Sequence, residues 1–221
     1  CPSGSCVAMI RHHYDGLLDE SSELADLKAK TFELCEFLTD VLEIEGISGS
    51  FPHRVGLHQS CHGLRELRLG SCTERMDSSE NKIRRLLESL EGIQFTELRR
   101  QDECCGFGGS FSIKFPDISN AILNKKLANI KATKAETVLA CDSGCLMQIA
   151  GGLSRQKIDA RVMHLAQFLD QESYWNEIIQ NPATEHYGYL GDAQHSQDFY
   201  GILDSLYFLD FFATKWDEGS A

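Results

Sequence analysis

The sequence predicts an α/β fold with a mostly parallel sheet, helices on both faces, and cysteines at the carboxyl ends of strands. Four short segments with strand character alternate with segments of helical periodicity. Strands separated by helices favour right-handed crossovers and therefore parallel pairing. Three of the predicted strands lead into cysteines, and ligands of such sheets bind outside the carboxyl ends of the strands.

Composition limits the class of protein. The 221 residues, 42% of them hydrophobic, suffice for one large domain or two small ones. A net charge of -12 without clustered Lys and Arg argues against a nucleic-acid partner. No apolar run approaches the roughly 18 to 20 residues of a membrane span. The nine cysteines are an odd number in a chain too long to need disulfide staples, so we expect reduced thiols and a cytoplasmic location.

The first predicted elements are helices. Residues 1–6 are expected to form a turn leading into a helix, with Cys6 at the helix N-terminus, where the dipole favours a thiolate. Residues 21–43 carry apolar side chains at helical spacing after the capping candidates Ser21 and Ser22. Cys35 lies within that apolar stripe, and we interpret it as a buried structural thiol.

The middle of the chain is expected to supply two strands. Residues 54–58 are a predicted strand that runs into Cys61, and residues 93–98 are a second strand that precedes Cys104 and Cys105. Residues 82–90 between them are typical of a helix. Residues 64–81 receive no element, and Cys72 within them receives no role.

The last part repeats the alternation of helix and strand. Residues 117–132 are a predicted helix, and residues 137–140 form a compact strand that ends at Cys141 and Cys145. A further helix starts at Leu146. Residues 161–164 form the last predicted strand, and residues 165–172 a helix.

The segment from Asp102 to Ser110 indicates a ligand-binding loop. Cys104 and Cys105 are followed by three glycines in four residues, so backbone with positive φ could approach a bulky inorganic group closely. Adjacent thiols fit different iron atoms of one cluster better than one tetrahedral ion. Cys61 and Cys145 follow other strands at the same edge, which favours a thiolate-ligated metal site. A vicinal disulfide or simply buried thiols is the alternative.

An internal similarity links the two ends of this region. Residues 2–10 and 141–149 both place small polar residues before a thiol and an apolar helix start that contains methionine. If this is a repeat, Cys6 is the last ligand of a preceding homologous half, and we expect that an upstream region is missing. Turn-to-helix junctions that merely look alike are the other explanation.

The motifs together resemble the cysteine-rich CCG-domain family, and within it the lactate-utilisation iron–sulfur oxidoreductases of the LutA and YkgE type. The resemblance covers roughly residues 1 to 170. It is carried by five segments in the expected order: Pro2 to Tyr14, Ser60-Cys61-His62, Asp102 to Gly109, Phe111 to Pro116, and Ser143 to Met147.

The resemblance implies an iron–sulfur protein that passes electrons during L-lactate oxidation with partner subunits. Its ligands would be Cys61, Cys104, Cys105 and Cys145. Residues 1–45 would end a first CCG half and connect it to a CCG domain at 46–172. The family's motif ends in two cysteines with two residues between them, whereas here Asp142 stands three residues before Cys145. Either Asp142 supplies a carboxylate, Cys141 turns in, or an ordinary four-thiolate cluster of the 4Fe–4S type is bound. We favour the last and keep Cys141 as a further candidate.

Two other functions remain open from the residues. A zinc-binding scaffold could use Cys61, Cys104 or Cys105, and Cys145 with His62 or His164. Thiol–disulfide chemistry at Cys104 and Cys105 would require an accessible thiolate of low pKa. Residues 173–221 are rich in aromatic side chains and match nothing in the family. They either dock a partner or pack back on the domain.

Overall fold

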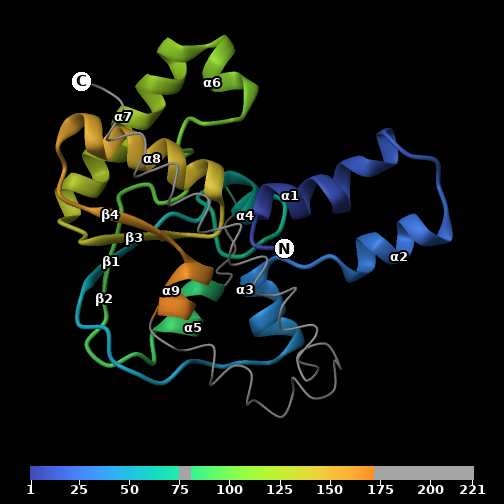
Figure 1. Cartoon of the computed structure of the whole chain (residues 1–221), viewed down its shortest axis with the longest axis horizontal. Coiled ribbons are helices and arrows are strands. Elements are labelled where there is room, and N and C mark those ends of the chain that lie inside the picture. The colour runs from blue at the N-terminus through green and yellow to red at the C-terminus, as the bar shows by residue number, and fades with distance from the viewer. Residues whose placement is uncertain (75–80, 172–221) are drawn as a thin grey trace.

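A computed structural model describes residues 1–74 and 81–171 as a layered α/β structure (Figure 1). One sheet has the strand order β2-β1-β3-β4, and every neighbouring pair is parallel. The strands are β1 (Arg54–Leu57), β2 (Gln94–Thr96), β3 (Thr137–Ala140) and β4 (Arg161–His164). The predicted fold class is therefore confirmed, and the carboxyl ends of the strands share one edge.

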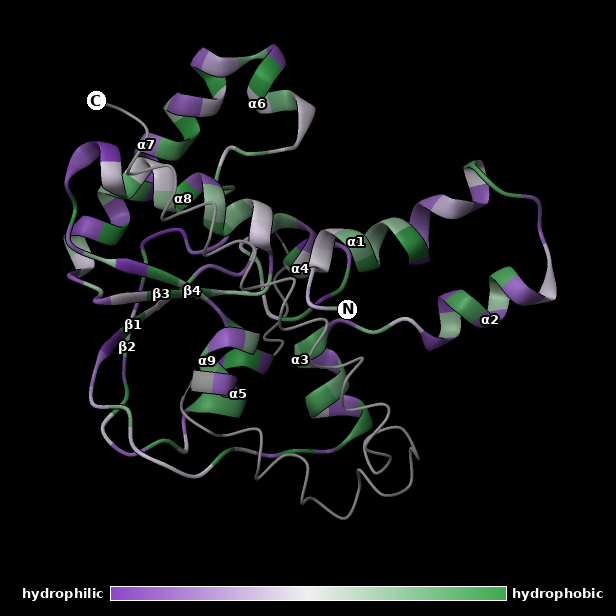
Figure 2. Cartoon of the chain, viewed as in Figure 1, coloured by the Kyte–Doolittle hydropathy of each residue, from purple (hydrophilic) through white to green (hydrophobic). Residues whose placement is uncertain are grey.

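Helices cover both faces of this sheet. α7 (Pro116–Thr133) and α8 (Ser143–Gln156) lie on one face, while α5 (Lys82–Leu87) and α9 (Leu165–Gln171) lie on the other (Figure 1). Hydrophobic residues recur along these helices where they meet the strands (Figure 2).

Each face has its own hydrophobic core. Successive strand residues point to opposite faces of the sheet. Leu139 therefore packs in the core between the sheet and helices α5 and α9, whereas Val138 packs in the core between the sheet and helices α7 and α8.

The prediction of one continuous helix over residues 21–43 is wrong. The structure has α2 (Ser22–Lys30), α3 (Leu34–Glu36) and a π-helical turn η3 (Phe37–Val41). Thr31 is extended, with φ -94° and ψ 114°, and the Glu33 carboxylate caps α3. The Arg11 guanidinium holds this break, because its Nε donates to the Thr31 carbonyl at 2.7 Å and a terminal nitrogen pairs with Glu36 at 2.8 Å. Tertiary contacts therefore override the helical periodicity.

The N-terminal segment forms an arm beside the sheet. α1 (Gly4–Ala8) continues as η1 (Met9–His13) and η2 (Tyr14–Gly16), and the far end of this segment extends with α2 away from the sheet (Figure 1). Two short helices received no prediction: α4 (Cys61–Arg65) after β1, and α6 (Ser110–Lys114) before α7.

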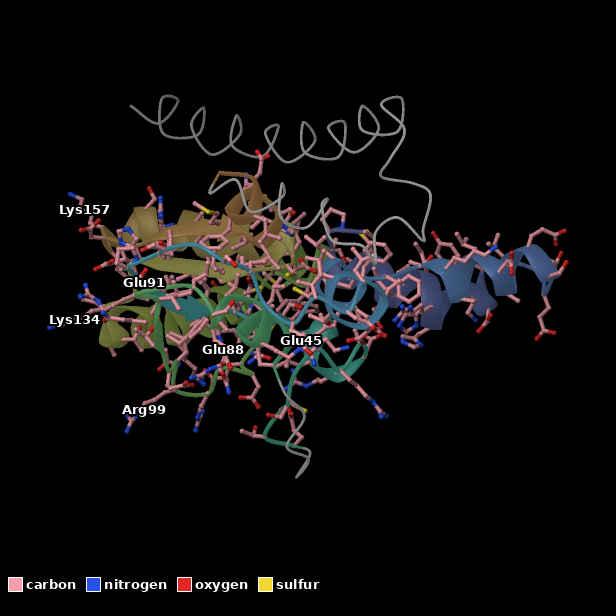
Figure 3. All side chains as sticks on the ribbon, turned by 90° about the horizontal axis from the view of Figure 1, so that it is seen from below. Glu45, Glu88, Glu91, Arg99, Lys134 and Lys157 are labelled. Atoms are coloured by element: carbon pink, nitrogen blue, oxygen red, sulfur yellow. The ribbon has the colours of Figure 1, made fainter. Side chains whose placement is uncertain are left out.

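The surface carries many charged side chains, and those of Arg99, Lys134 and Lys157 project outward (Figure 3). Within residues 1–74 and 81–171, no helix has the length and apolarity needed to cross a membrane. The aromatic-rich tail at 173–221 lies outside the described residues, so a docking role for it stays a prediction.

Candidate metal centre

Four thiols reach one place from the carboxyl ends of three strands. Cys61 is the first residue of α4 after β1, Cys104 and Cys105 lie in the loop after β2, and Cys145 lies in the first turn of α8 after β3. The sulfurs of Cys105 and Cys145 lie within 4.8 Å of each other, and the thiol of Cys104 is close enough to those of Cys61 and Cys105 to shift their pKa values. The structure thus brings together the four cysteines that the sequence proposed as ligands.

The thiols shift one another's acidity. Hydrogen bonds from Cys105 and Cys61 lower the pKa of Cys104 well below that of a free thiol. The bond to Cys104, together with burial, raises the pKa of Cys61 well above the usual value. The bonds to Cys104 and Cys145, followed by burial, raise the pKa of Cys105 in the same direction. Negative charge at this group of thiols is therefore concentrated on Cys104, and a bound cation would stabilise it.

The glycine that follows the paired cysteines is required by the packing. Gly106 has φ +87°, and a Cβ at this position would lie 2.5 Å from the Ser119 carbonyl oxygen on α7. The Ser119 hydroxyl donates to the Gly106 carbonyl at 2.7 Å and so fixes the loop against the helix. Only glycine allows this close approach of backbone to backbone.

The same loop turns backbone N–H groups toward sulfur. The Gly106 amide donates to Cys104 Sγ at 3.2 Å, and the Phe107 amide donates to Cys105 Sγ at 3.5 Å. Amide hydrogen bonds of this kind stabilise anionic sulfur and set the potential of iron–sulfur clusters.

Capping residues position the two helical thiols. The Ser60 hydroxyl accepts from the Gly63 amide at 3.1 Å and starts α4 at Cys61. Asp142 starts α8, because its Oδ1 accepts from the Cys145 amide at 3.4 Å. Its Oδ2 accepts from the Ser5 amide at 3.1 Å, so both carboxylate oxygens of Asp142 already have hydrogen-bond donors.

His58 is a further candidate that the sequence reasoning missed. A ring nitrogen of His58 and the sulfurs of Cys105 and Cys145 all lie within 4.8 Å of one another. His58 is 1% exposed, and neither ring nitrogen has a hydrogen-bond partner among the described residues. Burial lowers its pKa to about 3, so the ring is neutral and able to donate to sulfur or to bind metal.

Lys126 places a buried amine beside the thiols. It is 0% exposed on α7, and its Nζ donates to the Gln101 carbonyl at 3.4 Å. Burial lowers the pKa of Lys126, while Glu103 and the thiols of Cys105 and Cys104 oppose that shift. A cation here would offset negative charge on the sulfurs.

Other predicted candidates lie elsewhere. Cys141 packs in the core on the opposite face of the sheet, and Cys6 is exposed on α1 outside the ligand groups found among the described residues. His164 donates from Nε2 to the Pro2 carbonyl at 2.7 Å and accepts the Ala166 amide at Nδ1. His62 is half-exposed and pairs with Glu66 at 3.6 Å. The zinc alternative with His62 or His164 therefore loses support, and His58 is the histidine at the thiols.

Comparisons with known proteins identify the family of the chain. Residues 55–150 match the CCG family, described as a cysteine-rich domain. The chain is 38% identical over 172 residues to lactate utilization protein A of Oceanobacillus iheyensis, covering 76% of this chain and 66% of the relative. It is 38% identical to the protein of that name from Halalkalibacterium halodurans, covering 80% of this chain and 69% of the relative. For the Bacillus subtilis protein the values are 39%, 76% and 68%. The matched region thus spans about two thirds of each relative.

Proposed function

This chain belongs to the CCG cysteine-rich domain family, and from that premise we propose that it is an iron–sulfur electron-transfer protein, or subunit, of an L-lactate oxidation system. The observation that carries the proposal is the convergence of Cys61, Cys104, Cys105 and Cys145 from three strand ends. The relatives' name, lactate utilization protein A, supports the substrate class.

The residues present fit an iron–sulfur cluster. Four thiols are the donor set of a 4Fe–4S cluster, and two of their sulfurs already accept amide hydrogen bonds. His58 adds a buried ring with unpartnered nitrogens, and its N–H could donate to a sulfur of the cluster. When bound, such a cluster supplies reversible one-electron transfer.

The chain's own residues would define the direction of access. Cys105 and Cys145 are buried, whereas Cys61 and Cys104 are partly exposed. Electrons would therefore enter or leave on the side of Cys61 and Cys104, where another subunit can approach. The hydroxy-acid chemistry itself belongs, in this proposal, to partner subunits of the oxidation system.

A zinc scaffold is the second candidate, and one observation favours it. The ring of His58 and the thiols of Cys105 and Cys145 supply three ligand atoms within 4.8 Å, as a zinc site requires. Thiol–disulfide chemistry at Cys104 and Cys105 is the third, and the lowered pKa of Cys104 is the feature that supports it.

Anaerobic purification followed by metal and sulfide analysis tests the proposal. We expect iron and acid-labile sulfide in matching amounts, a broad visible absorption near about 400 nm, and bleaching by dithionite. Cys61→Ser should lose iron, while Cys72→Ser, which alters a buried thiol outside the group, should keep it. Stoichiometric zinc without sulfide would replace the proposal by the scaffold. A metal-free protein that cycles between dithiol and disulfide would replace it by thiol chemistry.

A further inference from the structure

A second group of ligand atoms lies on the opposite face of the sheet. The sulfurs of Cys35 and Cys141 and a carboxylate oxygen of Glu33 lie within 4.8 Å of one another. Cys35 and Glu33 are 0% exposed and Cys141 is 5% exposed. The two Sγ atoms are 3.3 Å apart although 106 residues separate them in sequence.

Strand alternation separates this group from the four-thiol centre. Leu139 and Cys141 are two residues apart, so both point toward α5 and α9, and both belong to the core on that face. Cys145 has already entered α8 and belongs to the core on the other face. Cys35 on α3 and Glu33, which caps α3, lie beside Cys141 on the face of the sheet that α5 and α9 cover.

The Glu33 carboxylate is only half satisfied. Its Oε2 accepts from the amides of Cys35 at 2.7 Å and Glu36 at 3.3 Å, but its Oε1 has no hydrogen-bond partner among the described residues. An unpartnered carboxylate oxygen in a fully buried position is costly, because no donor among the described residues compensates for the lost hydration. A cation at Oε1 would remove that cost.

The spacing of the sulfurs is closer to that of a zinc site than to that of a disulfide. Two thiolates on one tetrahedral zinc, with Zn–S bonds of about 2.3 Å, lie about 3.8 Å apart. A disulfide requires about 2.05 Å. The observed 3.3 Å needs an opening of about 0.5 Å for zinc and a closing of more than about 1.2 Å for a disulfide.

We propose that Glu33, Cys35 and Cys141 form a second metal site that binds one zinc ion or a similar thiophilic divalent cation. Two thiolates and one carboxylate are a zinc donor set, and a water molecule would complete the tetrahedron. On binding, the thiols of Cys35 and Cys141 lose their protons to solvent, and no oxidant or reductant takes part. The site is structural, and it does not depend on the proposed iron–sulfur function.

The first experiment measures zinc binding at Glu33, Cys35 and Cys141 in a protein whose four-thiol centre has been disabled. The full chain carrying Cys104→Ser and Cys145→Ser is purified anaerobically with reductant, dialysed against Zn²⁺ and analysed for metal. We expect one zinc per chain. X-ray absorption should give two sulfur neighbours near about 2.3 Å and lighter neighbours near about 2.0 Å.

Variants within the site decide the assignment. Added Cys35→Ser or Cys141→Ser should abolish retention of zinc. Glu33→Gln keeps an oxygen to cap α3 but loses the charge, and should weaken zinc binding by at least about tenfold. Cys72→Ser is the matched control, because it removes another buried thiol and should leave retention unchanged. Circular dichroism checks that each variant is folded.

Two results would overturn the proposal. One is zinc content that does not depend on Cys35 or Cys141. The other is a Cys35–Cys141 disulfide found by mass spectrometry in protein kept under reductant. Should the double-serine background fail to fold, the same site variants in the protein with an intact four-thiol centre would differ by one zinc per chain.

Discussion

Replacing Glu33 by glutamine should change how the stability of the metal-free protein depends on pH. Burial raises the pKa of Glu33 from 4.5 to about 7, although the amides of Glu36 and Cys35 oppose the shift. A raised carboxyl pKa means that the folded state binds the proton more tightly than the unfolded chain. The stabilisation that comes from proton binding at Glu33 is therefore complete below pH 4.5 and is lost as the pH rises through 7.

The shift sets the size of the effect. The rise of the Glu33 pKa from 4.5 to about 7 corresponds to about 3.4 kcal/mol. Between pH 5 and pH 8, the contribution of Glu33 to the free energy of unfolding falls by about 2.5 kcal/mol. The side chain is fully buried, so solvent screening does not reduce this figure.

The assay compares two proteins at each pH. Urea unfolding followed by circular dichroism, with chelator and reductant present, gives the free energy of unfolding for wild type and Glu33→Gln at pH 5, 6, 7 and 8. Burial lowers the pKa of His58 to about 3 and that of His164 to about 4, so both destabilise the fold as the pH falls below 6.5. Both histidines are present in both proteins, so their contributions cancel in the difference.

Wild type should lose about 2.5 kcal/mol relative to Glu33→Gln between pH 5 and pH 8. Glu88→Gln, which removes an exposed carboxylate, should follow wild type within about 0.5 kcal/mol. A difference in the free energy of unfolding between wild type and Glu33→Gln that stays constant from pH 5 to pH 8 would refute the conclusion that burial raises the pKa of Glu33. Added zinc should then remove the pH-dependent loss in wild type only, because the bound cation holds Glu33 ionised in the folded state.

Three further changes test the four-thiol centre. Cys145→Ser should lose iron and sulfide on anaerobic reconstitution, while Cys72→Ser retains both, and equal loss in the two variants would contradict the ligand assignment. Gly106→Ala should lower the free energy of unfolding by more than about 2 kcal/mol, since φ is +87° and the new Cβ meets Ser119 O at 2.5 Å. Gly151→Ala, with open space around its Cβ on α8, should be neutral or stabilising in the same urea assay. Lys126→Met should make the reconstituted cluster harder to reduce by roughly tens of millivolts in a redox titration, and an unchanged potential would separate the amine from the cluster.

Local patterns were enough to predict the sheet. The strands at 137–140 and 161–164 have the predicted bounds, and those at 54–57 and 94–96 lie within the predicted segments. Short apolar runs between helical segments carry this information because buried parallel strands are apolar on both faces. The convergence of Cys61, Cys104 and Cys145 then follows from topology alone.

Features that depend on distant contacts were not available from the sequence. The break between α2 and α3 depends on Arg11, which binds the Thr31 carbonyl from another helix. The burial of Cys35 was predicted from its apolar stripe, but its contact with Cys141 joins segments 106 residues apart. His58 was overlooked because a histidine at the end of a strand has no distinctive local pattern. Only the structure shows that its ring nitrogens lack partners.

The junction after β3 explains how one short segment can serve the two proposed metal sites. Cys141 continues the alternation of side-chain direction along β3 and points to the face that α5 and α9 cover. Asp142 starts α8 and so places Cys145 on the face that α7 and α8 cover. Three residues between the two thiols, instead of two, leave the capping position to Asp142. A thiol at that position would remove the cap and the hydrogen bond to the Ser5 amide. The spacing of Cys141 and Cys145 therefore favours a four-thiolate centre on the face of α7 and α8. It leaves Cys141 for a site with Cys35 and Glu33 on the face of α5 and α9.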